Sequence, residues 1–251
     1  MNTKMKTLSM AVLGLVGFAA TGVAMAQCPT TLAPPWTLTL QLQGTVTSQT
    51  PGYDTTACRL RTALNQSSSP AAKAAVLDQT PANETRYRAQ FIIDASQIPL
   101  TNANRAAIAF NVLGAVAPGS ASINMVTAFL TGNGANPILR LSIGDTAAAG
   151  SYQVVDVPLL NTTGANRFEI DLTVGAGTGS LRYWSTDVAT ATTDGSPTGT
   201  VTGLTNSGWT GVDQITLGLA GANSFWRNNF NNTQFVYFDQ FDSRRQTFIG
   251  H

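Results

Sequence analysis

The chain is poor in charged and titratable side chains. Only 11% of its 251 residues are charged, and it holds one histidine, His251, and two cysteines, Cys28 and Cys58. These are too few for a structural zinc site, and a lone histidine is a poor basis for a Ser-His-Asp type of nucleophilic centre. Gly-x-Ser-x-Gly elbows, phosphate-binding loops and dinucleotide fingerprints are missing as well. The sequence therefore predicts no metal ligand cluster and no nucleotide chemistry.

Long apolar runs are equally scarce. The one that occurs lies at residues 10–20, behind Lys4 and Lys6 and ahead of the small-x-small motif Ala24-Met25-Ala26. This order is typical of a secretory signal peptide, so we predict that residues 1–26 are removed. The run falls short of the ~20 residues of a spanning helix, and no later segment qualifies, so no integral membrane segment is expected after cleavage.

Cys28 lies just behind the predicted cleavage site, which raises the alternative of a lipid-anchored protein. Lipoprotein signals need Gly or Ala where this chain has Gln27, and this argues against lipidation. We therefore expect an exported protein, extracellular or periplasmic. In such an oxidising compartment Cys28 and Cys58 favour a disulfide, whose loop of about 30 residues implies a contribution of roughly 3–4 kcal/mol.

The charge balance limits the partners. Without Lys4 and Lys6 the count is 14 − 2 = 12 basic against 13 acidic residues, and Lys73 is the one lysine left. A near-neutral surface offers no basic patch, which excludes nucleic acid and anionic membranes as predicted partners. A glycan or a surface protein suits faces rich in Thr, Ser, Asn and Gln. The sequence carries no sign of an oligomeric state.

The chain does contain a series of short segments in which apolar and polar residues alternate, and it has no long helical pattern. Gly- and Asn-rich turns separate them, which predicts an all-β, antiparallel two-sheet sandwich or jelly roll. It occupies one domain, residues 27–251, with an irregular leader at 27–35. Residues 72–78 fit either a strand or a short helix opened by Ser69-Pro70. The other expected strands are residues 36–46, 58–64, 85–94, 107–115, 123–130, 138–143, 152–157, 167–174, 181–184, 200–204, 214–219 and 234–245.

The segment 234–245, QFVYFDQFDSRR, is predicted to be the last strand and a central one. Both of its faces are mostly apolar as far as Phe238, so it should be covered on both sides there. Beyond Asp239 it should reach a polar rim. Its alternating faces are Phe235, Tyr237, Asp239 and Phe241 on one side, and Val236, Phe238, Gln240 and Asp242 on the other.

Three stretches carry a resemblance to a known family. They are residues 81–94 (PANETRYRAQFIID), residues 167–174 (RFEIDLTV) with 179–184 (GSLRYW), and residues 211–221 leading to 237–250 (YFDQFDSRRQTFIG). Together they resemble the concanavalin A-like, laminin-G-like jelly rolls of exported bacterial proteins, over about residues 77–250. The resemblance implies two curved antiparallel sheets, a strand at 72–78, ligand binding on the concave face or rim, and frequently no catalysis.

The segment 221–234, GANSFWRNNFNNTQ, departs from the family pattern. A flat aromatic ring stacks on the apolar side of a sugar, while amides and a guanidinium hydrogen-bond its hydroxyls. The alternative is that Phe225 and Phe230 anchor the loop and the asparagines serve left-handed turns. The predicted ligand-binding residues are Trp226, Arg227, Asn228, Asn229 and Asn231.

Glu169 and Asp171 are the strongest catalytic candidates, because residues i and i+2 of a strand point to one face. The pair resembles part of the Glu-x-Asp signature of laminarinase-type β-glucanases, but the second glutamate that retaining hydrolysis needs is missing. The alternative is that both carboxylates pair with strand arginines across a solvated sheet. Those arginines are Arg86, Arg88 and Arg182.

Calcium is the one cofactor left open. It takes oxygen ligands, and laminin-G-like domains can carry it, so Asp239 with Asp242, or Asp145, are candidate ligands. The chain lacks a dense Asp-x-Asp-x-Asn loop, so no calcium site is predicted.

These observations favour a non-enzymatic, exported β-sandwich that binds a glycan or acts as a surface interaction module. One alternative is a self-assembling structural subunit of a surface or matrix, suggested by the low charge and the Thr- and Asn-rich faces. The other is a glycan hydrolase or lyase, and its specific form is a hydrolase of the laminarinase-like type with an incomplete Glu-x-Asp signature.

Overall fold

The computed structural model describes residue 28 and residues 34–66, 69–101, 104–116, 123–134, 136–145, 151–230 and 233–251. The predicted signal peptide at residues 1–26 and most of the leader at 27–35 lie outside the described residues. The described chain forms fourteen strands and one short helix. These are β1 (Leu38–Leu42), β2 (Gly44–Gln49), β3 (Arg59–Leu64), β4 (Lys73–Asp78), β5 (Arg86–Asp94), β6 (Ala107–Val116), β7 (Ile123–Asn133), β8 (Asn136–Gly144), β9 (Tyr152–Pro158), β10 (Ala165–Thr173), β11 (Ala176–Asp187), β12 (Gly199–Thr205), β13 (Trp209–Ala222), α1 (Ser224–Asn229) and β14 (Val236–Arg244).

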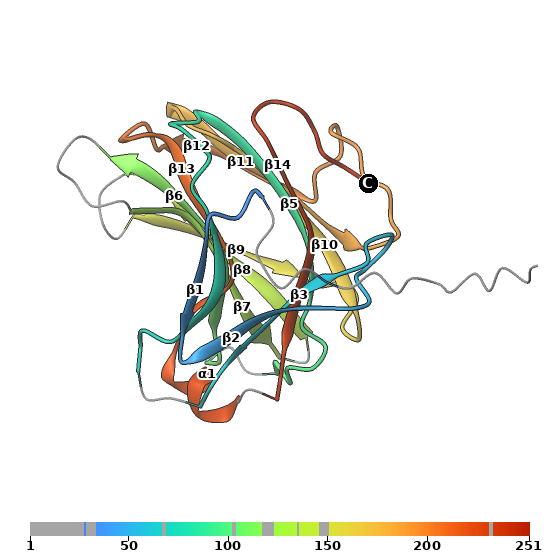
Figure 1. Ribbon diagram of the computed structural model, residues 1–251. Helices are drawn as coiled ribbons and strands as arrows, with labels where there is room; N and C mark the ends of the chain where they lie inside the picture. Colours follow the sequence, from blue (N-terminus) through green and yellow to red (C-terminus); the bar gives the residue numbers. More distant parts are fainter. Residues whose placement is uncertain are drawn as a thin grey trace, which may run out of the picture.

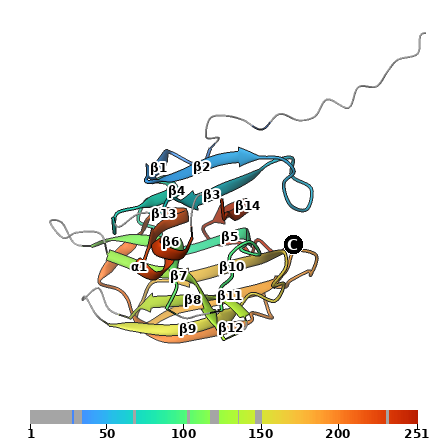
Figure 2. The same cartoon turned by 90° about the horizontal axis from the view of Figure 1, so that it is seen from below.

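The strands form two antiparallel sheets stacked on each other (Figure 1). Sheet A has the order β1-β4-β13-β6-β7-β8-β9, and sheet B has the order β12-β11-β10-β5-β14-β3-β2. From below, β1 and β2 lie at one side of the sandwich and β9 and β12 at the other (Figure 2). The predicted all-β, antiparallel two-sheet sandwich is confirmed, including the strand at residues 73–78.

Apolar side chains on the inner faces of both sheets form the core, because each strand sends every second residue inward. Phe91 of β5 lies at the centre of an aromatic cluster and is fully buried. Its ring centroid is 5.0 Å from that of Phe110 in sheet A, 5.4 Å from Phe168 and 6.1 Å from Phe238 in sheet B. This cluster therefore joins the two sheets.

The first predicted strand is in fact two strands in different sheets. β1 pairs with β4 in sheet A, whereas β2 pairs with β3 in sheet B. The chain changes sheets at Gln43, with a φ of 50°, and at Gly44, where a Cβ atom would lie 2.6 Å from the carbonyl oxygen of Lys73. Only glycine allows so close an approach. Leu38 and Leu42 were expected on the buried face of a strand. In the structure both side chains are 50% exposed, because β1 is an edge strand.

The last strand, β14, is central in sheet B, between β5 and β3, as its apolar faces predicted. The alternation breaks at a β-bulge between residues 239 and 242, where Gln240 has a φ of 45°. The bulge turns Phe241 back toward the core, where its ring centroid lies 4.6 Å from that of Trp36. The predicted faces beyond Asp239 are therefore wrong, because a bulge inserts an extra residue into the strand.

The predicted disulfide between Cys28 and Cys58 is present, with a Cα–Cα distance of 5.6 Å. It ties Cys28 to the residue before β3. In the part of the chain that the structure describes, no helix has the length and apolar character needed to cross a membrane.

Phe91→Ala is expected to lower the free energy of unfolding by about 3–5 kcal/mol, because it leaves a cavity between the two sheets. Phe225→Ala is the matched control. That ring is 55% exposed, so its loss should change stability by less than about 0.5 kcal/mol. Urea unfolding followed by tryptophan fluorescence measures both, and equal losses in the two variants contradict the packing described above.

Candidate functional site

The outer face of sheet B, turned away from the core, carries a dense set of polar side chains. Arg88 and Gln90 of β5 lie directly across from Asp171 and Glu169 of β10. The free face of an antiparallel sheet usually meets water, yet these four side chains are at most 3% exposed. We call this surface the polar face, made up of Arg88, Gln90, Arg167, Glu169, Asp171, Arg182 and Trp184.

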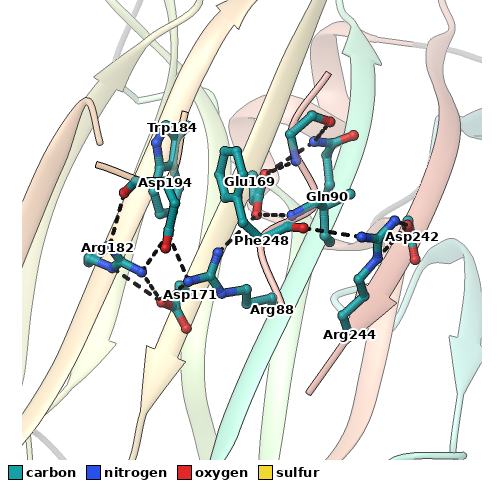
Figure 3. A network of polar contacts seen from close by, with 12 residues as sticks. Arg88, Gln90, Glu169, Asp171, Arg182, Trp184, Asp194, Asp242, Arg244 and Phe248 are labelled. Atoms are coloured by element: carbon teal, nitrogen blue, oxygen red, sulfur yellow. Dashed lines mark hydrogen bonds and ion pairs between the residues drawn. The ribbon is translucent and has the colours of Figure 1, made fainter. Parts of the chain in front are cut away.

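Asp171 is the centre of an ion cluster (Figure 3). Arg86 donates to both of its carboxylate oxygens at 3.0 Å, while Nη2 of Arg88 and Nη2 of Arg182 lie 2.9 and 2.7 Å from Oδ2. Asp194, from the loop after β11, contacts the same two guanidiniums at 2.9 and 2.8 Å. Burial opposes the charge on Asp171, but the hydrogen bonds from Arg86 and Arg182 and the charge of Arg88 outweigh it. The pKa of Asp171 therefore lies below its usual range.

The second carboxylate, Glu169, holds a piece of the chain's own backbone. It accepts hydrogen bonds from the backbone N–H groups of Ile249 at 3.2 Å and Gly250 at 3.0 Å, and Nε2 of Gln90 donates to the carbonyl oxygen of Gly250 at 2.7 Å. Phe248 packs beside Trp184, with ring centroids 5.2 Å apart. Residues 248–251, called the covering segment below, thus lie over the middle of the polar face (Figure 3).

Arg167 organises a second cluster next to the first. Its Nη1 donates to the amide oxygens of Gln90 at 2.8 Å and Gln240 at 3.0 Å, and its Nη2 lies 3.4 Å from Oδ2 of Asp54. The same Asp54 oxygen lies 3.4 Å from Nε2 of His251. Burial lowers the pKa of the Arg167 guanidinium, against the opposing effect of Asp54. Its Nε has no hydrogen-bond partner among the described residues.

Tyr53 brings a phenol to this surface from the loop between β2 and β3. Its hydroxyl donates to Asp94 and accepts a hydrogen bond from Nη1 of Arg59 at 2.6 Å. Its backbone N–H donates to Asp239 at 2.6 Å, which fixes the loop on β14. Burial, followed by the hydrogen bond to Asp94, raises the pKa of Tyr53, and Arg59 opposes this. The phenol therefore stays protonated at neutral pH, and its proton is held by Asp94.

A cavity of about 600 Å³ opens beside Tyr53 and Asp54. A cavity of this volume accommodates a small ligand. Val188 lines it, and the carbonyl oxygen of Val188 lies 3.4 Å from Nη2 of Arg167, so the cavity borders the Arg167 cluster. The rest of the wall is Leu160, Asn161, Ala165, Asp187 and Ala189.

The predicted pair Glu169 and Asp171 does lie on one face. Asp171 contacts each of the three arginines expected as its partners, Arg86, Arg88 and Arg182. The expected solvation is wrong, because the loop after β11 and the covering segment bury both carboxylates. Any catalytic role of the pair stays a prediction.

The predicted ligand-binding loop contains α1, a helix that sequence reasoning missed. Asn223 caps it by accepting a hydrogen bond from the N–H of Trp226 at 2.9 Å. Trp226 is 1% exposed and packs edge-on against Phe230, at 4.9 Å between centroids, so its ring is not open for sugar stacking in this structure. Phe225 is the aromatic residue that points outward.

The polar members of that loop mostly serve the fold. Arg227 donates to the carbonyl oxygen of Ala222 and is 7% exposed, and Nδ2 of Asn229 donates to the carbonyl oxygen of Phe225 at 2.6 Å. The backbone carbonyl oxygen of Asn228 accepts a hydrogen bond from Nε2 of Gln66 at 3.0 Å. Asn231 lies outside the described residues. A ligand-binding role for the loop stays a prediction.

The candidate calcium ligands are engaged by protein donors. Asp239 accepts from the Tyr53 loop, Asp242 lies 2.8 Å from Nη2 of Arg244, and Asp145 accepts from the N–H of Thr205 at 3.2 Å. Within the described ranges no three His, Cys, Asp or Glu side chains group closely enough to hold a metal ion. Calcium binding is untested and has no ligand cluster to support it there.

No protein-family model and no curated protein matches the chain. Solved structures do. An endo-β-1,4-glucuronan lyase from the fungus Trichoderma reesei aligns with a TM-score of 0.57 and 13% identity, over 85% of this chain and 92% of the lyase. The alginate lyase PA1167 from Pseudomonas aeruginosa aligns with a TM-score of 0.50 and 11% identity, over 75% of this chain and 83% of that one. At these identities the likenesses show a shared jelly-roll sandwich fold.

These likenesses correct the functional expectation. The two solved structures named above are polysaccharide lyases, which contradicts the expectation of a non-enzymatic binding or interaction module. They match neither the self-assembling subunit nor the laminarinase-like hydrolase. The expectation of a binding module came from the lack of a nucleophile motif, a metal-ligand cluster and a complete Glu-x-Asp signature in the sequence.

Sequence reasoning missed three parts of the site. Tyr53 was placed in a turn, and Arg167 was taken only as the start of a strand. Phe248 was part of the family resemblance without a role. The alternation of 86–94 and 167–173 does carry a usable signal, since each has an outward face of arginines, amides and carboxylates. What covers that face depends on loops distant in the sequence.

Asp171→Asn is expected to lower the free energy of unfolding at neutral pH by about 3–5 kcal/mol, because it leaves buried arginines without their shared carboxylate. Since the pKa of Asp171 is lower in the folded than in the unfolded chain, its stabilisation is present above pH ~3.9 and is lost as the pH falls through the folded-state value. The difference between wild type and variant should therefore shrink in acid.

The matched control is Asp156→Asn, which breaks the exposed pair with Arg140 on sheet A. Its cost should stay below about 1 kcal/mol. Denaturant unfolding from neutral pH down to acid measures both variants. A cost for Asp171→Asn as small as that of the control contradicts the buried cluster.

Proposed function

We propose that the protein is a polysaccharide lyase that acts on a uronate-containing glycan at the polar face of sheet B. The observation that carries the proposal is the burial of arginines, carboxylates and an amide on that face, in a fold that polysaccharide lyases share. Buried ion clusters of this kind seldom add stability compared with apolar packing, so function is the better reason for their presence.

The arginines suit the recognition of a uronate carboxylate. Arg88 keeps Nε and Nη1 without a hydrogen-bond partner among the described residues, although Nη1 lies 3.9 Å from Oε1 of Glu169. The Nε of Arg167 also has no hydrogen-bond partner among the described residues. A guanidinium forms two parallel hydrogen bonds with a carboxylate, and in a dry site this interaction is strong. Neutralising the carboxylate charge makes the proton on the adjacent ring carbon easier to remove.

Lyase chemistry then needs one proton acceptor and one proton donor. In β-elimination a base takes the proton from the ring carbon that bears the carboxylate, a double bond forms to the neighbouring carbon, and the glycosidic oxygen leaves with a proton. Glu169 supplies a carboxylate that accepts hydrogen bonds at the surface of the polar face. The carboxyl, once protonated, can return the same proton to the leaving oxygen, so one group serves as acceptor and donor. Elimination consumes no water and no redox partner.

The proposal includes three statements about the chain's localisation, family and partner. Export from the cytoplasm is supported by the disulfide and by the predicted signal peptide. Kinship with the concanavalin A-like, laminin-G-like family is supported by the sandwich fold, and a glycan partner by the fold's likeness to glycan-acting proteins.

Glu169→Gln is expected to lower kcat on β-1,4-glucuronan or alginate about 100-fold or more, because it removes the carboxylate that accepts the proton. Glu84→Gln is the matched control, since Glu84 pairs with Arg245 at 2.8 Å outside the polar face and its loss should have no effect on kcat. The measurement is the ultraviolet absorbance of the unsaturated uronate product. If the wild-type chain forms no such product from either polymer, the proposed function is wrong.

A further inference from the structure

The covering segment has the features of a ligand rather than of a structural strand. Residues 248–251 belong to no strand, yet their backbone makes three hydrogen bonds with Glu169 and Gln90, at 2.7 to 3.2 Å. In addition, Nη1 of Arg244 donates to the carbonyl oxygen of Phe248 at 3.1 Å. The polar face therefore binds an extended piece of the chain through hydrogen bonds to its backbone N–H and C=O groups.

The contacts correspond to those that a sugar needs. Phe248 packs on Trp184, 5.2 Å between ring centroids, and Arg88 lies 5.5 Å from the Phe248 ring. A pyranose ring stacks on tryptophan through its apolar side. The N–H groups of Ile249 and Gly250 donate to Glu169 as ring hydroxyls do, and the carbonyl oxygen of Gly250 accepts from Gln90 as a hydroxyl or carboxylate oxygen does.

The polar groups beneath the segment are only partly satisfied by it. Arg88 is 1% exposed, and its Nε and Nη1 lack hydrogen-bond partners among the described residues. A buried donor without a partner is costly. A uronate carboxylate supplies the acceptor oxygens that a peptide backbone in this position does not.

From these contacts we infer that Trp184, Glu169, Gln90 and Arg88 form a uronate subsite, and that residues 248–251 fill it as a stand-in for the glycan. This inference rests on the proposed function. The glycan and the covering segment compete for one surface, so the apparent affinity for the glycan is set by the fraction of molecules in which the segment has left. Phe248 is the residue that most directly occupies the sugar position.

The test compares the full chain with Phe248→Ala, and with Phe225→Ala as the control for loss of a phenylalanine elsewhere. Isothermal titration with an oligoglucuronate should show about tenfold tighter binding by Phe248→Ala and no change for the control. Acrylamide should also quench one more tryptophan in Phe248→Ala, because Trp184 becomes uncovered. Circular dichroism confirms that both variants are folded.

A synthetic peptide with the sequence of residues 244–251, RRQTFIGH, gives a second measurement that does not depend on a variant's stability. It should compete with the oligoglucuronate for Phe248→Ala, while a peptide with Ala in place of the phenylalanine should compete poorly. Competition together with the affinity gain supports the inference.

The remaining outcomes separate the two claims. Equal oligoglucuronate affinities of wild type and Phe248→Ala, with lyase activity in both and no competition by the peptide, overturn the subsite occupancy and leave the proposed function standing. If Trp184 becomes quenchable but neither chain binds or cleaves a uronate polymer, the proposed function fails and the subsite fails with it.

Discussion

Burying charge on the outer face of a sheet is the constraint on which the rest of this structure depends. Arg88, Glu169 and Asp171 each lose their hydration, and an unpaired buried charge is strongly destabilising. Each must therefore meet an opposite charge or a hydrogen-bond partner from its own sheet or from a segment above it. The surrounding architecture, including the ordering of loops far apart in sequence, follows from that requirement.

The strands of sheet B hold the polar side chains in place from beneath. Period-two alternation puts Phe91 and Phe168 into the core and leaves Arg88, Gln90 and Glu169 on the opposite side of the same two strands. The aromatic cluster behind the sheet holds β5 and β10 in a fixed register. The polar side chains in front of it therefore meet at defined positions, which a mobile loop could not ensure.

Three segments that lie over the polar face supply further partners for its charged and polar side chains. Asp194 neutralises part of the arginine excess around Asp171, Asp54 does the same beside Arg167, and the covering segment satisfies Glu169 and Gln90. Of these, the covering segment is bound through backbone groups, through the ring of Phe248 beside Trp184 and Arg88, and through His251, whose Nε2 lies 3.4 Å from Asp54. Among the described residues it makes no ion pair with the Asp171 cluster, and we propose that it is the element a glycan replaces.

The fold was largely predictable from the sequence, and the site only in part. Alternation of apolar residues located β5, β10 and the central β14, because a two-sheet core leaves that pattern directly in the chain. The sheet change at Gly44 and the bulge at Gln240 were missed, since both depend on backbone conformations set by close contacts. Glu169 and Asp171 were found by spacing, whereas Tyr53 and Phe248 reach the face from segments that alternation does not describe.

We propose that the polar face is a glycan site, which the covering segment occupies when no glycan is bound. Amide hydrogen exchange of Ile249 and Gly250, with and without saturating oligoglucuronate, tests it most directly. Both N–H groups donate to Glu169, so they should exchange slowly in the free chain and much faster when the glycan takes their place. Exchange that is unchanged or slower at saturation would contradict the claim.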